Sequence, residues 1–452
     1  MASTYLTRTF GSAGNRKTWT WSVWVKRSAL GGTQNLLNAG HPTNPWWTLT
    51  FNSDAINFAQ TSGTSASWAT SALFRDTSAW YHIVLAVDTT SSTSTMNGSS
   101  TDRIRLYVNG EQYTVTGGTI PSQNADLQVN QAIEHRIGTA PYGNAFDGLM
   151  SHIHFIDGTA YGPDNFGSTD ATTGEWKIKT SPSVTYGTNG FFILKDGNSV
   201  TDQSGNSNNW TVGGGTLTKT EDNPSNNFAT LNAVSFHEAN FSLSNGANTM
   251  ATGNNTAWNN AICSTLVATG GKFYWEAKWT DGDSYSIIGI IKAEDIHRCA
   301  TSLSGTGTDI YMHANAIQTD NGGGSPQKYS FVSSDGNISI SAPPGCIMQF
   351  ALDCENRKFW FGVNGTFYNS GNPATGANPT WDTTDIPADG EFVPYAQGYK
   401  ISGATAFQFN FGNGYFGTTA VSSAGTNASN NGIFEYDVPS GFTALSTKGL
   451  NE

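Results

Sequence analysis

Charged residues are scarce in this chain of 452 residues. Lys and Arg number 22 and Asp and Glu number 34, so 12% of the residues are charged, about half the usual share in globular proteins. The net charge of −12 argues against a phosphate-binding surface, so we expect no nucleic-acid partner. Long apolar runs are also missing, since stretches such as 287–291 fall far short of the roughly 18 residues that a membrane span needs. We therefore expect no membrane insertion.

Cysteines are equally few, and all four lie in the second half of the chain. Their spacings match no zinc pattern and no Cys-x-x-Cys pair occurs. We expect Cys346 and Cys354 to mark the two ends of one strand, too far apart to bond each other. Two alternatives stand for the others, a Cys263–Cys299 disulfide or reduced thiols, and four buried thiols are favoured.

Turn-forming dipeptides are abundant in this chain, in contrast to charged residues. The chain has 51 glycines, eight Asn-Gly steps and six Asp-Gly steps, which supply the positive φ angles of tight hairpins. Between them lie alternating or apolar runs typical of strands, at 19–26, 80–87, 104–108, 148–156, 273–279, 347–352, 359–363 and 406–411. In the first run, Trp19, Trp21 and Val23 are expected to share one face, before a local irregularity. No window longer than about ten residues has a helical period. The fold class predicted is all-β, with antiparallel β-sandwiches.

The two halves are built on a similar plan. Each contains a strand that ends in Val-Asn-Gly, within Arg103–Gly110 and Arg357–Gly365. Either any antiparallel sandwich reuses this hairpin, or the chain holds two domains of one superfold, which we favour. The Ser-, Asn- and Gly-rich segment between them is interpreted as a strap that returns to the first domain. We predict a first domain at 1–228, with its strap at about 166–228, and a second at 229–452.

Ordered sets of short motifs run through both halves. In the first half they are Tyr5–Thr9, Gly14–Ser22, Trp24–Arg27, Trp80–Val84, Leu106–Gly110, Phe146–Gly148 and Phe155–Gly158, followed in the strap by Phe166–Asp170, Tyr186–Phe191, Asp202–Asn206, Asn209–Thr211 and Asp222–Asn232. This set resembles the laminin-G-like, concanavalin-A-type jelly roll of bacteriophage virion proteins. In the second half they are Gly271–Glu276, Leu352–Asp353, Trp360–Gly365, Phe392–Pro394 and Phe409–Gly412. This second set resembles a SPRY domain.

The resemblance implies a structural protein of a phage particle, a tail-fibre or spike tip or a surface decoration, that displays lectin-like domains toward a host surface or glycan. One alternative is a head or tail decoration protein without a host ligand, and another is a glycan depolymerase. The implied partners are other capsid or tail proteins and further copies of the chain, with a trimer favoured by analogy with virion appendages. No heptad or long repeat supplies a shaft. The implied location is the virion surface, after assembly in the host cytoplasm, and residues 1–10 lack the layout of a signal peptide.

One departure from the family concerns the first strand. Relatives carry an apolar strand before the segment that begins at Tyr5, whereas four residues precede it here. The hypothesis that follows is an open sheet edge, which a neighbouring chain completes.

Catalytic motifs are missing. The Glu-x-Asp-x-x-Glu strand of concanavalin-A-type glucanases does not occur, and neither does Gly-x-Ser-x-Gly or a phosphate loop. Glu294-Asp295 and Glu221-Asp222 are adjacent pairs, whose side chains would point to opposite faces of a strand, so we interpret them as solvated turns. We expect a protein that is not an enzyme.

Metal ligands are weakly indicated, and no cofactor is expected. His152 and His154 alternate on one strand and would face the same side, where they could share a metal ion. The alternative, two ordinary histidines on a polar face, is favoured. Calcium is common in laminin-G-like sandwiches, and Asp54 or Asp147 would be loop ligands for it, although no Asp-x-Asp-x-Asp cluster occurs.

Aromatic residues in loops are the better indication of binding. Candidate ligand-binding residues are Trp46, Trp47 and Tyr142 in the first half, with Trp258 and Tyr285 in the second. Sugars stack their C–H faces on such rings, while Asn, Asp and backbone groups bind the hydroxyls. The alternative is that these rings belong to the core, as most of the 14 tryptophans will.

Overall fold

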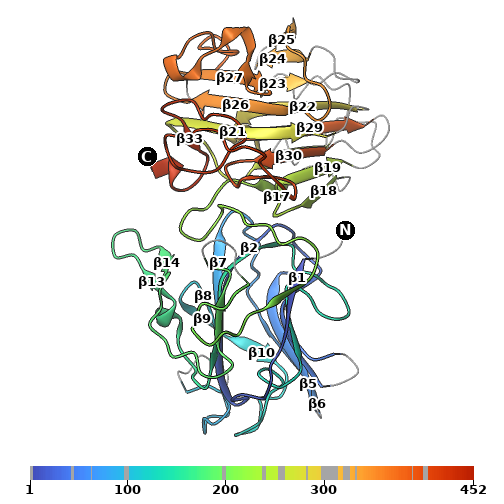
Figure 1. Cartoon of the computed structure of the whole chain (residues 1–452), viewed down its shortest axis with the longest axis vertical. Helices are drawn as coiled ribbons and strands as arrows, with labels where there is room; N and C mark the ends of the chain where they lie inside the picture. Colours follow the sequence, from blue (N-terminus) through green and yellow to red (C-terminus); the bar gives the residue numbers. More distant parts are fainter. Residues whose placement is uncertain are drawn as a thin grey trace. The chain divides into compact units, whose positions relative to one another are not determined.

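The computed structural model describes residues 4–41, 45–62, 64–95, 101–195, 200–236, 241–252, 260–280, 284–296, 314–318, 326–330, 333–388, 390–400 and 406–451. The chain divides into two compact units, Met1–Lys219 (unit 1) and Thr220–Glu452 (unit 2). Each unit is built from two large sheets whose strands are antiparallel neighbours, apart from one short parallel pair (Figure 1). This confirms the predicted all-β fold of two sandwiches. None of the helical segments that the structure describes is long and apolar enough to cross a membrane.

Unit 1 contains an eight-stranded sheet, sheet A, and a six-stranded sheet, sheet B. In spatial order sheet A consists of β10 (Val115–Gly117), β6 (Thr64–Thr70), β5 (Ala55–Ser62), β4 (Trp46–Asn52), β3 (Thr33–Ala39), β11 (Glu134–Ile137), β1 (Tyr5–Thr9) and β16 (Thr211–Gly214). Sheet B consists of β15 (Phe191–Ile193), β12 (Gly148–Asp157), β2 (Thr18–Arg27), β7 (Trp80–Asp88), β8 (Ile104–Val108) and β9 (Glu111–Tyr113). Apolar side chains from both sheets form one core.

Strand β2 shows how the sequence pattern builds this core. Trp19, Trp21 and Val23 alternate toward the core and are fully buried, as predicted. The expected irregularity is not in β2, because β2 pairs with β7 without interruption from Thr18 to Lys26. It lies instead in the other neighbour, β12, whose register with β2 shifts between Ser151 and His154.

The second face of sheet B is covered as well. A short ribbon of β13 (Gly167–Thr169) and β14 (Trp176–Ile178), together with the 3-10 turn η1 (Pro163–Asn165), follows β12. Phe166 beside this ribbon joins Val84 and Ile156 of sheet B in a separate apolar cluster. Because both of its faces are buried, β2 has hardly any exposed residue along its length.

The strap returns to unit 1 and closes the sheet edge that the sequence left open. Strand β15 pairs with β12, and Trp210 packs edge-on against Phe191 in the core. Strand β16 then pairs with β1, whose other neighbour is β11. The hypothesis that another chain completes the edge of β1 is therefore wrong, because the strap supplies the missing strand itself.

The two units separate earlier than the predicted boundary at 228/229. Residues after Lys219 already belong to unit 2, where the Asn226 amide donates to Asn431 Oδ1 over 2.9 Å. Phe228 is buried in an apolar cluster of unit 2 with Tyr274 and Phe442. The last residues of the predicted strap are thus part of the second sandwich.

Unit 2 also contains two large sheets. One consists of β17 (Leu231–Phe236), β20 (Asn260–Ser264), β29 (Phe392–Lys400), β22 (Ser284–Lys292), β23 (Ala314–Gln318), β24 (Gln327–Ser330) and β25 (Ser333–Asn337). The other consists of β18 (Phe241–Ser244), β19 (Thr249–Thr252), β30 (Ala406–Asn410), β21 (Lys272–Trp279), β26 (Ile347–Asp353), β27 (Lys358–Val363) and β28 (Thr366–Phe367), with β33 (Thr443–Ala444) beside β21. Smaller elements are β31 (Tyr415–Phe416), β32 (Thr419–Ala420) and the 3-10 turns η2 (Ala293–Asp295), η3 (Tyr368–Ser370), η4 (Pro373–Thr375) and η5 (Gly449–Asn451).

Two cysteines flank one strand of this unit, as predicted. Cys346 directly precedes β26 and Cys354 directly follows it. Both are reduced, and burial raises the pKa of each thiol to about 12. Cys263 is buried, whereas Cys299 lies outside the described residues, so their pairing stays a prediction.

Candidate functional site

Two of the predicted binding residues meet at the surface of sheet A. Trp46 begins β4 and is half-buried, and Tyr142 lies in the loop after β11 with 46% of its surface exposed. Their ring centroids are 6.5 Å apart with an interplanar angle of 64°, an edge-to-face contact. The pair joins a strand and a loop that are almost a hundred residues apart in sequence.

Hydrogen bonds hold this pair in place. The Thr48 hydroxyl on β4 donates to Asn35 Oδ1 over 2.7 Å, and the Tyr142 hydroxyl bonds to the same Thr48. The Asn35 amide donates to the carbonyl oxygens of Asn144 and Gly143 at 2.9 and 3.3 Å. Tyr142 is therefore tied to sheet A through its own hydroxyl and through the two residues that follow it, so the ring needs little ordering when a ligand binds.

Trp47 has a different place from the one predicted. It is only 1% exposed and packs edge-to-face against Trp19, with 5.6 Å between the ring centroids. Neighbouring residues of a strand point to opposite faces, so only one of the two adjacent indoles can reach the surface. The interpretation of Trp47 as a ligand-stacking residue is wrong, and its role is core packing.

The two candidates in the second half stay predictions. Trp258 lies outside the described residues. Tyr285 is part of β22, where it pairs with Tyr399 of β29, but the side chain of Tyr285 is not described.

His152 and His154 lie in a buried aromatic cluster. The centroids of their rings are 5.7 and 4.0 Å from that of Phe192. His154 Nδ1 is 2.9 Å from the Tyr186 hydroxyl, and burial lowers the pKa of His154 well below its usual value, with smaller contributions from His152, His82 and Lys195. Within the described residues no group of three or more His, Cys, Asp or Glu side chains is placed to hold a metal ion. The shared metal ion stays a prediction, and the contacts seen are those of two rings packed against Phe192.

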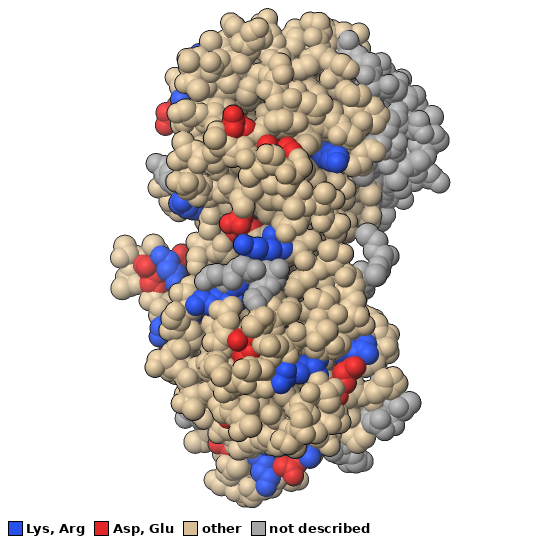
Figure 2. Space-filling view, viewed as in Figure 1, with Lys and Arg blue, Asp and Glu red and all other residues tan. Residues whose placement is uncertain are grey.

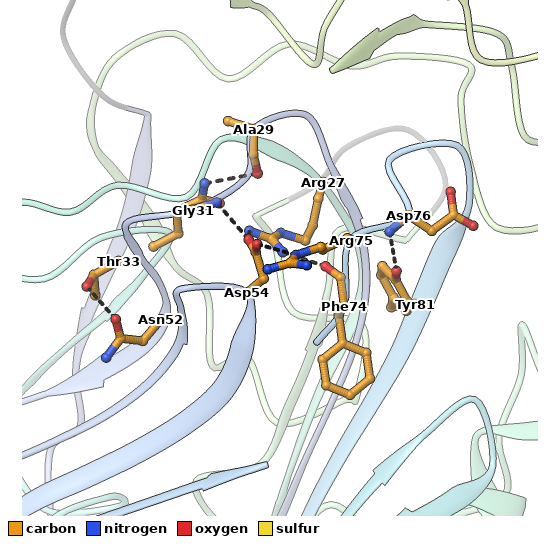
Figure 3. Close-up of polar contacts among 11 residues, drawn as sticks. Arg27, Ala29, Gly31, Thr33, Asn52, Asp54, Phe74, Arg75, Asp76 and Tyr81 are labelled. Atoms are coloured by element: carbon orange, nitrogen blue, oxygen red, sulfur yellow. Dashed lines mark hydrogen bonds and ion pairs between the residues drawn. The ribbon is translucent and has the colours of Figure 1, made fainter. Parts of the chain in front are cut away.

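Asp54 is not free to serve calcium. Its two carboxylate oxygens accept hydrogen bonds from Arg27 and Arg75, each at 3.0 Å (Figure 3). Two guanidinium groups beside one carboxylate repel a divalent cation, which argues against Asp54 as a calcium ligand, and calcium binding stays a prediction. The other candidate, Asp147, accepts a hydrogen bond from the Ser28 hydroxyl at 2.9 Å, and burial raises its pKa.

Each adjacent acidic pair contains one buried aspartate, Asp295 in the first and Asp222 in the second. Glu294 is exposed in η2 and forms an ion pair with Lys292 at 3.0 Å, so the prediction of a solvated turn holds for Glu294 and is wrong for Asp295. Asp222 accepts a hydrogen bond from the Phe228 amide at 3.3 Å. It holds the start of unit 2, and the prediction of a solvated turn is wrong for this residue.

One buried carboxylate was missed by the sequence reasoning. Glu276 on β21 is fully buried and accepts hydrogen bonds from the Glu435 and Tyr436 amides, both at 2.9 Å. The Tyr274 hydroxyl and the Asn410 amide donate to it as well, at 2.9 and 3.3 Å. Burial raises the pKa of Glu276 to about 7, against the lowering effect of these hydrogen bonds. A single Glu amid Phe, Tyr and Trp in 273–279 was the available signal.

The comparisons with known proteins agree with the fold of unit 1. Residues 2–165 match the family model of the concanavalin A-like lectin/glucanases superfamily. The chain carries a concanavalin A-like domain at its N-terminus. No curated protein is similar enough in sequence to count as a match.

Two solved SPRY structures are also similar to this chain. The SPRY domain of human HERC1 has 15% identity and a TM-score of 0.26, over 38% of this chain and 92% of that one. The PSpry domain of TRIM65 has 16% identity and a TM-score of 0.28, over 40% of this chain and 88% of that one. The SPRY interpretation of unit 2 is kept as a prediction.

Proposed function

We propose that this chain is a non-enzymatic structural protein of a bacteriophage particle, at a tail-fibre or spike tip or on the particle surface, and that its N-terminal domain recognises a host-surface glycan. The observation that supports glycan recognition is the Trp46–Tyr142 pair, which presents two prepositioned rings at the surface of sheet A. The phage particle is supported by the ordered motifs, which resemble those of phage virion proteins.

The surface chemistry suits an uncharged ligand. Lys, Arg, Asp and Glu are sparse on the face shown in Figure 2. Beside the ring pair lies the half-buried Thr61, whose hydroxyl accepts a hydrogen bond from the Trp46 amide at 3.4 Å. Aromatic rings with hydroxyl and amide groups around them form the pattern that binds neutral sugars.

A glycan array tests the proposal. The full chain should bind a subset of bacterial surface glycans, and Trp46→Ala and Tyr142→Ala should each weaken that binding at least tenfold, about 1.4 kcal/mol. Ile433→Ala, which removes an exposed apolar side chain from unit 2, is the matched control and should bind as the wild type does.

Other outcomes favour the alternatives. A folded wild-type chain that binds no glycan would support a decoration protein, and release of reducing ends from a host polysaccharide would establish a depolymerase. The proposed assembly is a homo-oligomer, a trimer by analogy with virion appendages. Size-exclusion chromatography with light scattering checks it, and a purely monomeric chain contradicts it.

A further inference from the structure

A strained turn lies at the opposite end of β4 from Trp46. Ser53 and Asp54 form the two-residue connection between β4 and β5, with φ angles of 47° and 70°. Such turns favour Asn-Gly or Asp-Gly, because a side chain in the left-handed region is disfavoured. A non-glycine pair held there points to a role for the Asp54 side chain.

Asp54 is the centre of an ion network that fixes four segments (Figure 3). Its Oδ1 accepts from Arg27 Nη2 at 3.0 Å and from the Gly31 amide at 2.7 Å, and its Oδ2 accepts from Arg75 Nε at 3.0 Å. The Arg27 side chain is fully buried, lies 4.3 Å from the Phe51 ring centre and donates to the Phe74 carbonyl. The buried Arg27 therefore already balances the charge of Asp54.

Arg75 is the second cation of this network and has the opposite exposure. Its side chain is 60% exposed, and among the described residues it bonds only to Asp54, through Nε. The neighbouring carboxylate of Asp76 is bound by the Ser78 amide at 2.7 Å and by the Ser78 hydroxyl, and it forms no ion pair with Arg75. The terminal amino groups of Arg75 thus face solvent as a positively charged fork, and the hydrogen bond from Nε to Asp54 sets its orientation.

We propose that Arg75 is a recognition residue for a carboxylate on a protein partner. A guanidinium held at Nε presents two parallel N–H donors that match the two oxygens of a carboxylate. Leu73, two residues before Arg75 in the chain, is a large apolar side chain with 47% exposure, and it offers no aromatic face of the kind that a sugar needs. Arginine beside an apolar contact is the pattern of a protein interface. The occupant is therefore an acidic peptide segment, and this surface is separate from the Trp46–Tyr142 pair.

Biolayer interferometry of the full chain on immobilised poly-L-glutamate tests this assignment. The wild type should bind, and Arg75→Gln should weaken binding at least tenfold. Arg75→Lys keeps the charge but loses the fork, so it should fall between the two. Lys177→Gln is the matched control, because Lys177 is also an exposed cation of unit 1 paired with an aspartate, and it should change binding less than twofold.

Three results would overturn the proposal. They are a wild type that does not bind poly-L-glutamate, an Arg75→Gln variant that binds as the wild type does, and equal or stronger binding to polygalacturonate, which would indicate an acidic sugar. Unchanged melting temperatures of the variants show that they fold. Glycan binding through Trp46 is measured separately, so either proposal can fail without the other.

Discussion

The Trp176 indole donates a hydrogen bond from Nε1 to His82 Nδ1 over 2.9 Å, and the two rings stack with their centroids 6.0 Å apart. Since Nδ1 accepts this bond, the proton of the neutral imidazole lies on Nε2, which is 2.9 Å from Ser22 Oγ. His82 also stacks on Trp24, with 4.7 Å between the ring centroids. The ribbon of β13 and β14 is thus fastened to sheet B through a buried, neutral histidine.

Acid should destabilise unit 1. Burial lowers the pKa of His82 to about 3 and of His135 to about 4, and it lowers that of His154 well below 6.5. Below pH 6.5 the unfolded chain binds protons that the folded unit does not. The free energy of unfolding is therefore highest above pH 6.5 and decreases as pH falls toward 4. Three such protons correspond to a loss of up to about 4 kcal/mol per pH unit. Calorimetric melts between pH 7.5 and 4.5 measure it, and His82→Gln should reduce the slope by about a third. A flat melting temperature over this range would contradict the expectation.

In unit 2, Glu276 should make the free energy of unfolding depend on pH in the opposite direction. The pKa of Glu276 is raised to about 7 in the folded state, against 4.5 for an ordinary Glu. The folded unit therefore holds its proton more tightly, and this stabilisation is complete below pH 4.5 and is lost as pH rises through 7. Its full size is about 3 kcal/mol. The melting transition of unit 2, followed from pH 5 to 8, should fall more steeply in the wild type than in Glu276→Gln, whose amide does not titrate. Parallel curves would show that Glu276 does not titrate in this range.

The Trp176 ring packs directly against two glycines, and a side chain at either position should disturb this packing. A Cβ at Gly167 would lie 2.6 Å from the Trp176 ring, and one at Gly110 would lie 2.5 Å from it. Gly167→Ala should cost about 1–3 kcal/mol of unfolding free energy through overpacking, measured by denaturant titration. Gly162→Ala, in the same segment, meets no atom within 4 Å and should change stability by less than about 0.5 kcal/mol. Equal effects of the two substitutions would refute the packing argument.

Substitutions of the two adjacent indoles of β4 should affect stability and glycan binding differently. Trp47→Ala leaves a cavity beside Trp19 and should cost about 3–5 kcal/mol. Trp46→Ala removes a half-buried ring and should cost much less, while it abolishes most glycan binding. Thermal melts and array binding of both variants give the comparison. A large loss of stability in Trp46→Ala would show that Trp46 is a core residue and would contradict its assignment to the binding site.

Local patterns in the sequence were enough to predict the strands. Seven of the eight runs chosen for alternation or apolar content lie within strands, and the eighth, 406–411, extends one residue beyond β30. The faces of Trp19 and Trp21 follow from period-2 alternation. Asn109-Gly110 and Asn364-Gly365 form hairpin turns with positive φ angles, as such steps do. Asn189 and Asn431 look the same in sequence, yet both are buried and use their amides to join distant segments.

The sequence by itself therefore determined the fold class and which residues alternate across each strand, because both depend on neighbours a few residues away. Tertiary structure alone decided which face of a strand is covered. It put Trp47 in the core and Trp46 with Tyr142 at the surface, and it made the strap the missing neighbour of β1. These outcomes depend on contacts between residues far apart in the chain, and no local period records which segment will cover a given face.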